Sequence, residues 1–405
     1  MEPRPATPSL LRELNDRTAL ELLLTRGPMT RAQVGAHTGL SKVTAAQLLA
    51  RLEERGLVQI TGTQSGGRGP NAAVYAVVPS SAYVAGLHVE AEVVSAGIAD
   101  ITGRVVASVA IDPRGSLDPI AMTHRAVAAA CASAAIDQAD LRAFVIGSPG
   151  VVDPRTGDIQ LAVNMPEWHE GVLGALRRDL GRTVIIENDT NLAAMAEHAD
   201  GAARQLGDFA LVWLGTGLGL AAVLNGRPHK GVAGAAGEIG YLPVPGVGLP
   251  EDVHRPLTGS FQSLAGASVI RKLATGFGFG GGAGSDVSVA AKAVEAAVAD
   301  VASGGAHATG FHGTGFLSEL ASRVALGVAS ICVVLDPGLV VLGGPVGLAG
   351  GTELASRVAA EVGRICPATP TVVPTELANG PVLRGAILAA VAEMRQELLA
   401  SVGPA

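Results

Sequence analysis

The sequence is poor in cysteine, and the three cysteines that it has lie far apart. Cys131, Cys332 and Cys366 form no C-x-C or C-x-x-C pair. Three cysteines at this spacing are too few for a disulfide framework and do not match the ligand spacing of a structural zinc site. We therefore expect no metal centre, no cofactor and a reducing, cytoplasmic compartment.

Long hydrophobic runs are also missing. No stretch of about 20 uninterrupted apolar residues occurs, although hydrophobic residues make up 48% of the chain. The polar N-terminus does not resemble a signal peptide. Both observations argue against a membrane protein, and a length of 405 residues predicts two or three domains with large cores.

Charge is low in total but unevenly distributed. The formal net charge of −7 by itself argues against nucleic-acid binding. Residues 1–70, however, contain nine Lys and Arg against six Asp and Glu, a net +3, whereas the remainder contains twenty against thirty, a net −10. A basic head on an acidic body is typical of a DNA-binding module joined to a sensor. Because +3 is a small excess, we expect a homodimer or homotetramer to place two heads on paired half-sites.

Residues 31–52 carry the signals of a helix-turn-helix. A helix over residues 31–37 is expected to end at Thr38 and Gly39, since glycine tolerates the left-handed position after a helix. Ser41 would cap a second helix. Apolar residues of that helix recur at helical spacing and give it one apolar face: Ala45, Leu48, Leu49 and Leu52. With a preceding helix over residues 11–26, this arrangement places the second short helix in a DNA major groove.

The opposite face of that helix supplies side chains suited to DNA. Glutamine pairs with adenine edges, threonine and alanine methyl groups contact thymine, and lysine or arginine meets phosphates. We predict DNA contacts from Arg31, Ser41, Lys42, Thr44, Ala46, Gln47 and Arg51. Strands over residues 57–60 and 74–78 would form a wing, and Arg68 at its Gly-Gly-Arg-Gly-Pro tip would enter a narrow minor groove. A winged helix that serves only protein contacts is the alternative.

From residue 83 onward, expected strands and helices alternate, which predicts an α/β body with a mainly parallel, doubly wound sheet. Asn188 and Asp189 directly follow the apolar run Val184-Ile185-Ile186, and ligands bind at such carboxyl ends of strands. Asp189 could take a proton from a sugar hydroxyl, or it could only cap the next helix. The glycine-rich run at residues 215–219 suits either a phosphate or a tight hairpin.

Five motifs then occur in order along the body. They are Gly-Ser-Pro-Gly-Val-Val-Asp (147–153), Glu-Asn-Asp-Thr-Asn (187–191), Leu-Gly-Thr-Gly-Leu-Gly (214–219), Gly-Ala-Ala-Gly-Glu-Ile-Gly (234–240) and Val-Leu-Gly-Gly-Pro (341–345). Together they resemble the ROK family (repressors, open reading frames and sugar kinases), and the winged head with Gly-Gly-Arg resembles its repressor branch. The resemblance covers almost the whole chain.

This resemblance implies an actin-like, ribonuclease-H-like, sugar-kinase-type body of two lobes with a ligand cleft between them. We expect a winged helix-turn-helix over residues 1–79, a first lobe over 80–190 completed by a C-terminal helix at 381–405, and a second lobe over 191–380. The resemblance implies that the effector-binding residues are Asn164, Asn188, Asp189, Glu238, Tyr241 and Gln262.

Two departures from the family pattern argue against catalysis. The kinases have an Asp-x-Gly-Gly-Thr phosphate loop, and here His88 replaces the Asp, both glycines are missing and Glu92 stands in place of Thr. Glu90 and Glu92 would repel ATP phosphates, so Asp189 is interpreted as a vestigial general-base position. Tyr241 replaces a zinc-binding His, and the zinc-binding cysteines are missing.

The sequence thus predicts a DNA-binding transcription regulator, a repressor that senses a sugar or sugar derivative. The alternatives are an ATP-dependent sugar kinase with an added winged head and a regulator that has lost small-molecule binding. The expected partners are a double-stranded DNA operator, a sugar effector and further copies of the chain, with no membrane.

Overall fold

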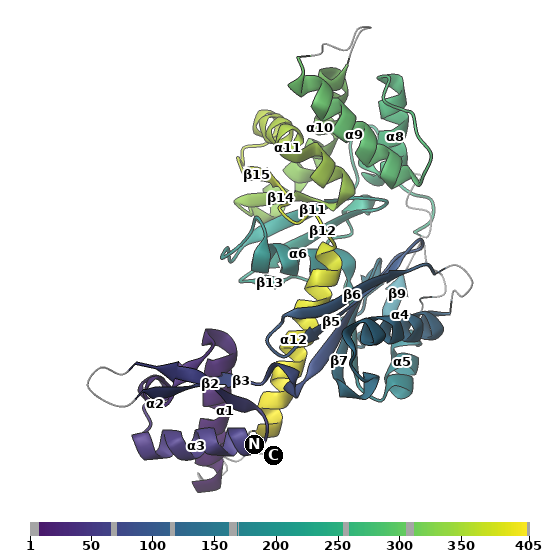
Figure 1. The fold of residues 1–405 in the computed structure, drawn as a ribbon. Helices are drawn as coiled ribbons and strands as arrows, with labels where there is room; N and C mark the ends of the chain where they lie inside the picture. Colours follow the sequence, from purple (N-terminus) through teal and green to yellow (C-terminus); the bar gives the residue numbers. More distant parts are fainter. Residues whose placement is uncertain are drawn as a thin grey trace.

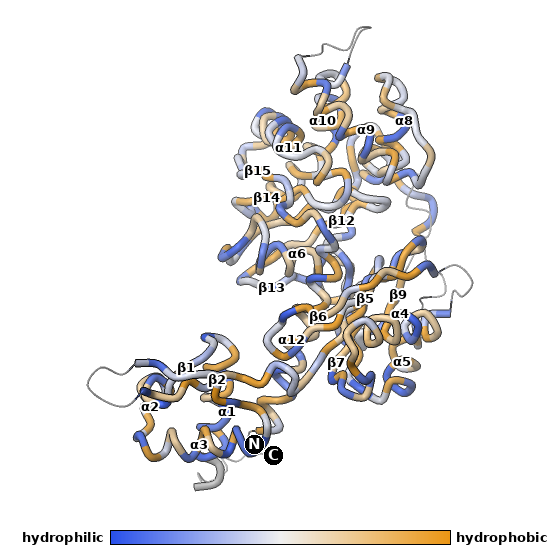
Figure 2. Tube along the Cα trace, in the orientation of Figure 1, coloured by the Kyte–Doolittle hydropathy of each residue, from blue (hydrophilic) through white to orange (hydrophobic). Residues whose placement is uncertain are grey.

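A computed structural model describes residues 8–65, 71–113, 118–161, 168, 170–253, 259–304 and 312–402. These residues form an N-terminal head and two lobes, each lobe built on its own five-stranded sheet (Figure 1). The 3-10 turn η1 (Pro79–Ser81) lies between the head and the first lobe. Figure 2 shows hydrophobic residues along the strands of both sheets, which is where the cores lie.

The head is the predicted winged helix-turn-helix, which is confirmed. It consists of α1 (Pro8–Arg26), β1 (Met29–Thr30), α2 (Arg31–Thr38), α3 (Lys42–Glu54), β2 (Val58–Gln64) and β3 (Ala72–Val77). Gly39 ends α2 at a φ of 71°, and Ser41 Oγ accepts a hydrogen bond from the Thr44 N–H at 3.2 Å. Thr30 and Gln33 add a capping box at the start of α2 that was not predicted.

The sheet of the first lobe has the strand order β10-β7-β4-β5-β6. Its strands are β4 (Tyr83–Val89), β5 (Val94–Asp100), β6 (Val105–Ile111), β7 (Leu141–Ser148) and β10 (Thr183–Asn188). Helices α4 (Pro119–Ala134) and α5 (Val172–Leu180) cover one face, and α12 (Pro381–Val402) covers the other. Successive side chains of a strand point to opposite faces, so Ala85 packs in the core under α4 while Val84 packs in the core that includes α12. The short turn η2 (Gln138–Asp140) precedes β7.

The sheet of the second lobe has the order β13-β12-β11-β14-β15. Its strands are β11 (Phe209–Leu214), β12 (Leu218–Leu224), β13 (Arg227–Pro228), β14 (Leu339–Gly343) and β15 (Thr371–Pro374). The helices that belong to this lobe are α7 (Gln262–Ala265), α8 (Ala267–Gly276), α9 (Asp286–Ala302), α10 (Gly313–Leu335) and α11 (Gly344–Ile365).

Both sheets have the same order when their strands are counted along the chain. In each, the first strand pairs in parallel with the fourth, the fourth with the fifth, and the first three form an antiparallel meander. The expectation of a mainly parallel, doubly wound sheet was therefore wrong in detail. Only three strands of each sheet are parallel, and the other two extend the sheet by antiparallel pairing. The predicted two-lobed body is confirmed.

Two helices join the parts of the molecule. Helix α6 (Asp189–Asp200) follows β10 of the first sheet and packs against β11 and β12 of the second. Helix α12 packs against α6, and an ideal Cβ on Gly385 would lie 1.9 Å from the Leu192 carbonyl oxygen, so only glycine permits this approach. At its other end, α12 contacts α1 of the head. One hydrophobic cluster consequently includes buried residues of the head and of both lobes.

Helix α10 is the one described helix that is long and apolar enough to cross a membrane by length and composition. It packs against α9 and α11, and 56% of its most apolar window is buried inside the structure. This burial is the pattern of a core helix rather than of a lipid-facing span.

Candidate functional site

The exposed face of α3 gathers most of the predicted DNA-contacting residues. Its other face is fully buried through Ala45, Leu48, Leu49 and Leu52. Lys42 and Gln47 are exposed, Thr44 and Ala46 are half-buried, and Arg31 is exposed at the start of α2. The sequence reasoning missed Val43, whose 67% exposure places an apolar side chain beside Lys42. The sequence could have indicated this exposure, because Val43 lies outside the apolar stripe of α3.

Arg51 has a different environment from the other candidates. Its Nε donates a hydrogen bond to Asp16 Oδ2 at 3.0 Å, and its guanidinium forms an ion pair with the same carboxylate. This hydrogen bond is the main reason that the pKa of Arg51 is raised. Asp16 is a buried residue of α1, so Arg51 joins α3 to α1.

The wing exists as an antiparallel β2–β3 hairpin, in which Gln64 pairs with Ala72. The predicted contact Arg68 at its tip lies outside the described residues, as does the predicted effector residue Asn164.

Four acidic residues from the two lobes are linked by electrostatic interactions, and we call them the carboxylate cluster: Glu90, Glu92, Asp189 and Glu238. Glu90 and Glu92 lie in the turn between β4 and β5, and Asp189 begins α6 directly after β10. Glu238 comes from the second lobe, just before the turn η3 (Ile239–Tyr241). The negative charge of Asp189 acts on both Glu90 and Glu238, so residues far apart in sequence share one site.

Three members of the carboxylate cluster have raised pKa values: Asp189, Glu238 and Glu90. Burial raises the pKa of Asp189 to about 6. Burial and then the charge of Asp189 raise the pKa of Glu238 to about 7. The pKa of Glu90 is raised by burial and then by Asp189 and Glu92. A carboxyl accepts hydrogen bonds when ionised and can also donate one when protonated. A raised pKa makes both forms accessible near neutral pH, which suits the hydroxyl groups of a sugar.

Asn188 caps α6, a role that the sequence reasoning considered for Asp189. Its Oδ1 accepts from the Asn191 N–H at 3.1 Å, and its Nδ2 donates to the Gly150 carbonyl at 3.0 Å. Asp189 Oδ1 instead accepts from the Thr190 N–H at 2.6 Å. The side chain of Asn188 is therefore engaged in holding α6 against the first lobe, which leaves Asp189 as the residue available at this strand end.

Close backbone contacts fix the loop that carries Glu238. Gly234 has a φ of +80°, and an ideal Cβ there would lie 1.9 Å from the Val152 carbonyl oxygen. Val152 belongs to a small hairpin of β8 (Val151–Val152) and β9 (Ile159–Leu161). Gly234 thus lets the second lobe approach the first.

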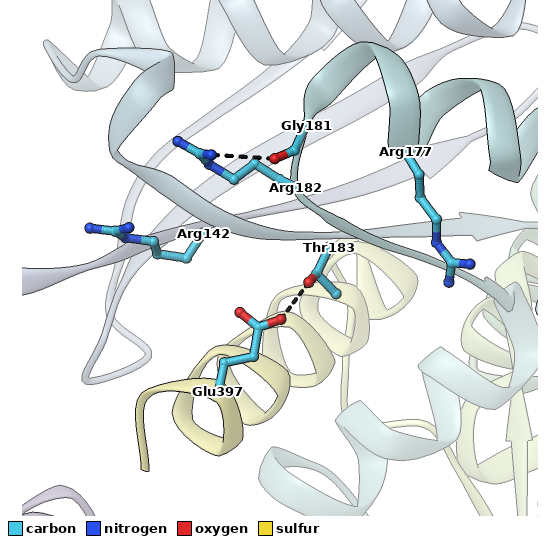
Figure 3. Close-up of a pocket in the computed structure, with 6 residues that line it drawn as sticks. All are labelled: Arg142, Arg177, Gly181, Arg182, Thr183 and Glu397. Atoms are coloured by element: carbon cyan, nitrogen blue, oxygen red, sulfur yellow. Dashed lines mark hydrogen bonds between the residues drawn. The ribbon is translucent and has the colours of Figure 1, made fainter. Parts of the chain in front are cut away.

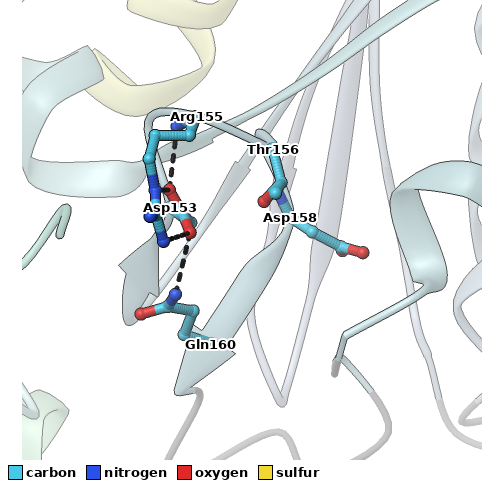
Figure 4. Close-up of polar contacts among 5 residues, drawn as sticks. All are labelled: Asp153, Arg155, Thr156, Asp158 and Gln160. Carbon is cyan, nitrogen blue, oxygen red and sulfur yellow. Dashed lines mark hydrogen bonds and ion pairs between the residues drawn. The ribbon is translucent and has the colours of Figure 1, made fainter.

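The β8–β9 hairpin is itself held by Asp153 (Figure 4). Its carboxylate accepts hydrogen bonds from Arg155 Nη2 at 2.9 Å and from Gln160 Nε2 at 3.0 Å. The bond from the Arg155 side chain is the main reason that the pKa of Asp153 falls to about 2. Asp153 therefore remains ionised and serves the hairpin rather than the carboxylate cluster.

An ion pair between Lys230 and Glu187 also links the lobes. Lys230 Nζ, on the segment after β13, pairs with the buried carboxylate of Glu187 at the end of β10. Glu187 Oε1 also accepts from Asn191 Nδ2 at 3.1 Å. The ammonium group of Lys230 is in this way already paired with a carboxylate.

Tyr241 and Gln262 form hydrogen bonds to the protein's own backbone. Tyr241 donates its hydroxyl to the Val253 carbonyl at 2.5 Å. Gln262 is buried, with Oε1 accepting from the Leu218 N–H at 2.9 Å and Nε2 donating to the Thr216 carbonyl at 2.9 Å. Both side chains hold loops around Glu238, so their geometry is that of positioning residues.

The residues present do not fit the zinc site of the family's kinases. In the part of the chain that the structure describes, no group of three or more His, Cys, Asp or Glu could hold a metal ion. Where the family has a zinc-binding His, Tyr241 holds its loop by a hydrogen bond instead.

The residues also fit a nucleotide poorly. In the turn between β11 and β12, the Gly215 N–H donates to the Gly217 carbonyl and the Leu218 N–H to Gln262. The backbone N–H groups of Gly215 and Leu218, which a bound phosphate would need as donors, are therefore already in hydrogen bonds.

The end of β4 does not offset negative charge either. Burial there lowers the pKa of His88 to about 4. His88 is therefore neutral at neutral pH, and it does not offset the charges of Glu90 and Glu92.

The model of the ROK family matches residues 84–393, and a MarR family model matches residues 14–69. A glucokinase of Halalkalibacterium halodurans is 32% identical over 219 residues, which are 54% of this chain and 65% of that protein. The DNA-binding transcriptional dual regulator NagC of Escherichia coli is 25% identical over 266 residues, 65% of each chain. The xylose repressor of Bacillus subtilis is 25% identical over 254 residues, 59% of this chain and 62% of that protein. The matches thus span just under two thirds of these relatives.

Solved structures agree with the fold. A ROK family transcriptional regulator, a homologue of the E. coli MLC protein, superposes with a TM-score of 0.72 at 19% identity, over 97% of this chain and 98% of that one. The ROK hexokinase of Thermus thermophilus superposes with a TM-score of 0.60 at 27% identity, over 78% of this chain and 99% of that one. The match to the transcriptional regulator includes the head, whereas the match to the hexokinase covers only part of this chain. The chain belongs to the ROK family and carries a MarR-type winged helix at its N-terminus.

Proposed function

We propose that this protein is a DNA-binding transcription regulator, a repressor, that responds to a sugar or sugar derivative. The observation that carries the proposal is the fusion of a complete winged helix-turn-helix to a ROK body through α12, which contacts both. The proposed division is a head at residues 1–79, a first lobe at 80–190 completed by 381–405, and a second lobe at 191–380. The protein would act in the cytoplasm, where its operator is.

The proposed DNA interface is the exposed face of α3 with the start of α2. Gln47 and Lys42 would contact bases and phosphates in the major groove, with Val43 against a thymine methyl group. Arg51 would act indirectly by fixing α3 on α1 through Asp16. The head carries a net charge of only +3 in residues 1–70, so we propose a homodimer or homotetramer that binds two half-sites.

The proposed effector site is the carboxylate cluster. Asp189 and Glu238 come from different lobes, and burial raises the pKa of Asp189 to about 6 and that of Glu238 to about 7. Carboxyls that exchange protons near neutral pH can both accept hydrogen bonds from sugar hydroxyls and donate to them. The negative charges of Glu90 and Glu92 disfavour a phosphorylated ligand at this site, so the effector would be an unphosphorylated sugar. E. coli NagC and the xylose repressor of B. subtilis, both similar in sequence, support a sugar response.

A sugar kinase is the second candidate, favoured by the similarity to a glucokinase and by Asp189 at the general-base position. Against it stand His88, Glu90 and Glu92 in place of a phosphate loop, and the occupied N–H groups of the β11–β12 turn. We propose that the protein has no kinase activity. A coupled ATP-turnover assay over a hexose panel tests this: turnover that disappears in Asp189→Asn would establish the kinase instead.

The regulator is tested by fluorescence anisotropy on the duplex upstream of its own gene, at one fixed salt concentration. Tight binding that one sugar releases supports the whole proposal. Tight binding that no sugar changes retains the regulator and removes its small-molecule effector. Absence of specific binding refutes the proposal.

A further inference from the structure

We propose that a second ligand site lies at the edge of the first lobe opposite the carboxylate cluster, and that it binds a small molecule carrying two phosphate groups. The site is a cavity of about 560 Å³ that we call the arginine pocket. It is lined by Arg142, Arg177, Gly181, Arg182, Thr183 and Glu397 (Figure 3).

The pocket and the carboxylate cluster lie at opposite ends of the same strands. Arg142 is near the start of β7 and Thr183 is the first residue of β10, whereas Asp189 directly follows β10. A strand rises about 3.3 Å per residue, so the length of β10 separates the two sites by roughly 20 Å. The pocket is therefore distinct from the proposed effector site.

The pocket carries uncompensated positive charge. It contains three arginines and one carboxylate, Glu397, which accepts a hydrogen bond from Thr183 Oγ1. The described residues provide no ion pair for Arg142, Arg177 or Arg182. This surplus stands out in a body whose residues after position 70 carry a net charge of −10. Such a concentration of guanidinium groups without carboxylate partners favours an anion.

Two of the guanidinium groups are positioned by backbone carbonyls. Arg182 Nε donates to the Leu141 carbonyl at 3.1 Å, and its terminal nitrogens donate to Ala139 and Gly181, each at 3.3 Å. Arg177 Nε donates to the Val184 carbonyl at 3.0 Å, which leaves both terminal nitrogens for a ligand. Since less rotational freedom is lost when the groups are held beforehand, binding of an anion costs less entropy.

The arrangement of the arginines indicates two charged ends in the ligand. Figure 3 shows the guanidinium groups of Arg142 and Arg182 on one side of the pocket and that of Arg177 on the other. Guanidinium forks bind phosphate in a bidentate manner. A volume of about 560 Å³ is that of a site for a small metabolite. A compact molecule with a phosphate at each end matches the placement of the arginines on two sides and the size of the pocket.

Isothermal titration calorimetry on the full chain tests the proposal, with fructose 1,6-bisphosphate, fructose 6-phosphate and inorganic phosphate as probes at physiological salt. We expect the bisphosphate to bind at least about tenfold more tightly than either single phosphate, because each charge-assisted contact contributes to affinity. Failure of the bisphosphate to bind, or equal affinity for all three probes, overturns the proposal.

Variants decide whether the heat comes from this pocket. Arg142→Ala breaks no hydrogen bond in the described structure and, alone or with Arg177→Ala, should weaken bisphosphate binding about tenfold or more. Arg178→Ala is the matched control, since it removes the same charge from the exposed surface of α5 beside the pocket. Equal losses in Arg142→Ala and Arg178→Ala would overturn the assignment.

DNA phosphates are the other source of this chemistry, and a separate measurement distinguishes them. Arg142→Ala should leave the anisotropy titration with duplex DNA unchanged when no small molecule is present. A lower affinity for DNA would show that the pocket contacts the duplex and would overturn the proposal. The calorimetric result stands independently of whether the chain binds DNA.

Discussion

Replacing Glu238 with glutamine tests whether the carboxylate cluster holds a proton near neutral pH. Folding raises the pKa of this carboxyl from 4.5 to about 7. The folded chain therefore binds a proton that the unfolded chain has released in this window, so the contribution of Glu238 to stability falls as pH rises from 4.5 to 7. Above pH 7 Glu238 is ionised in the folded state beside Asp189, and the resulting loss of folding stability has reached its full value.

The size of the effect follows from the two pKa values. A difference of about 2.5 pH units corresponds to about 3 kcal/mol, at 1.36 kcal/mol for each unit. Because Glu238 is only half-buried and its surroundings relax, we expect about 1–2 kcal/mol. Glutamine has nearly the shape of the protonated carboxyl and cannot ionise. Glu238→Gln should therefore be more stable than the unsubstituted chain at pH 8 by this amount, and the gain should vanish near pH 4.5.

Urea titrations at pH 5 and pH 8, followed by circular dichroism, measure this difference. Glu295→Gln, on the exposed side of α9, is the matched control and should show the same small change at both pH values. A gain for Glu238→Gln that is equal at pH 5 and pH 8 would refute the reasoning, as would destabilisation at pH 8. In that case Glu238 would be ionised at little cost and the proposed proton would be absent.

Further expectations concern the head, the β11–β12 turn and metal content. Gln47→Ala should lower the affinity for operator DNA by about 1–3 kcal/mol in anisotropy titrations without changing the oligomeric state, and unchanged affinity would mean that α3 is not the recognition helix. Asp16→Asn should destabilise the head by about 1–3 kcal/mol, measured by thermal melting, because Arg51 loses its carboxylate. Gln262→Ala should lower the melting temperature, since it frees the Leu218 N–H and the Thr216 carbonyl; an unaltered melting curve would contradict its positioning role. Chelation with EDTA should leave the melting temperature unchanged, and a stoichiometric zinc by elemental analysis would count against the described loop geometry.

The head was predictable because its signals are local. Gly39 and Ser41 stop and start helices by their own conformational and hydrogen-bonding preferences, and both appear where the sequence indicated. The pairing of Arg51 with Asp16 could not be predicted in the same way, because it joins residues 35 positions apart. An arginine on the edge of a recognition helix has the same sequence pattern whether it binds a phosphate or a carboxylate.

The body shows where local signals fail. Helix α11 has weak local signals in the sequence because its first turns are rich in glycine, a residue that opposes helix formation. In the structure those glycines allow close packing: an ideal Cβ on Gly347 would lie 2.6 Å from the Leu342 carbonyl oxygen. At Gly351 the φ of 52° bends the helix. Tertiary packing thus outweighed propensity at these positions.

For the candidate site, sequence identified the acidic residues but not how they are arranged. Asp189 and Glu238 were both predicted as ligand residues, whereas Glu90 was considered only as a defect in a phosphate loop. Its proximity to Asp189 depends on the pairing of β4, β7 and β10. Tyr241 and Gln262 matched family positions, yet their partners are backbone groups that only the folded loops bring near.

Helix α12 connects the carboxylate cluster, the proposed effector site, directly to the head. Its first half packs on α6, whose first residue is Asp189, and its last turns contact α1. Arg55 at the end of α3 donates to the Ser401 carbonyl at 3.5 Å. A helix of 22 residues spans about 33 Å, so α12 joins the region of the carboxylate cluster to the head as one element within one hydrophobic cluster. A displacement of α6 against the first sheet must therefore move α12 or break its packing, and either event reaches α1 without passing through a flexible linker.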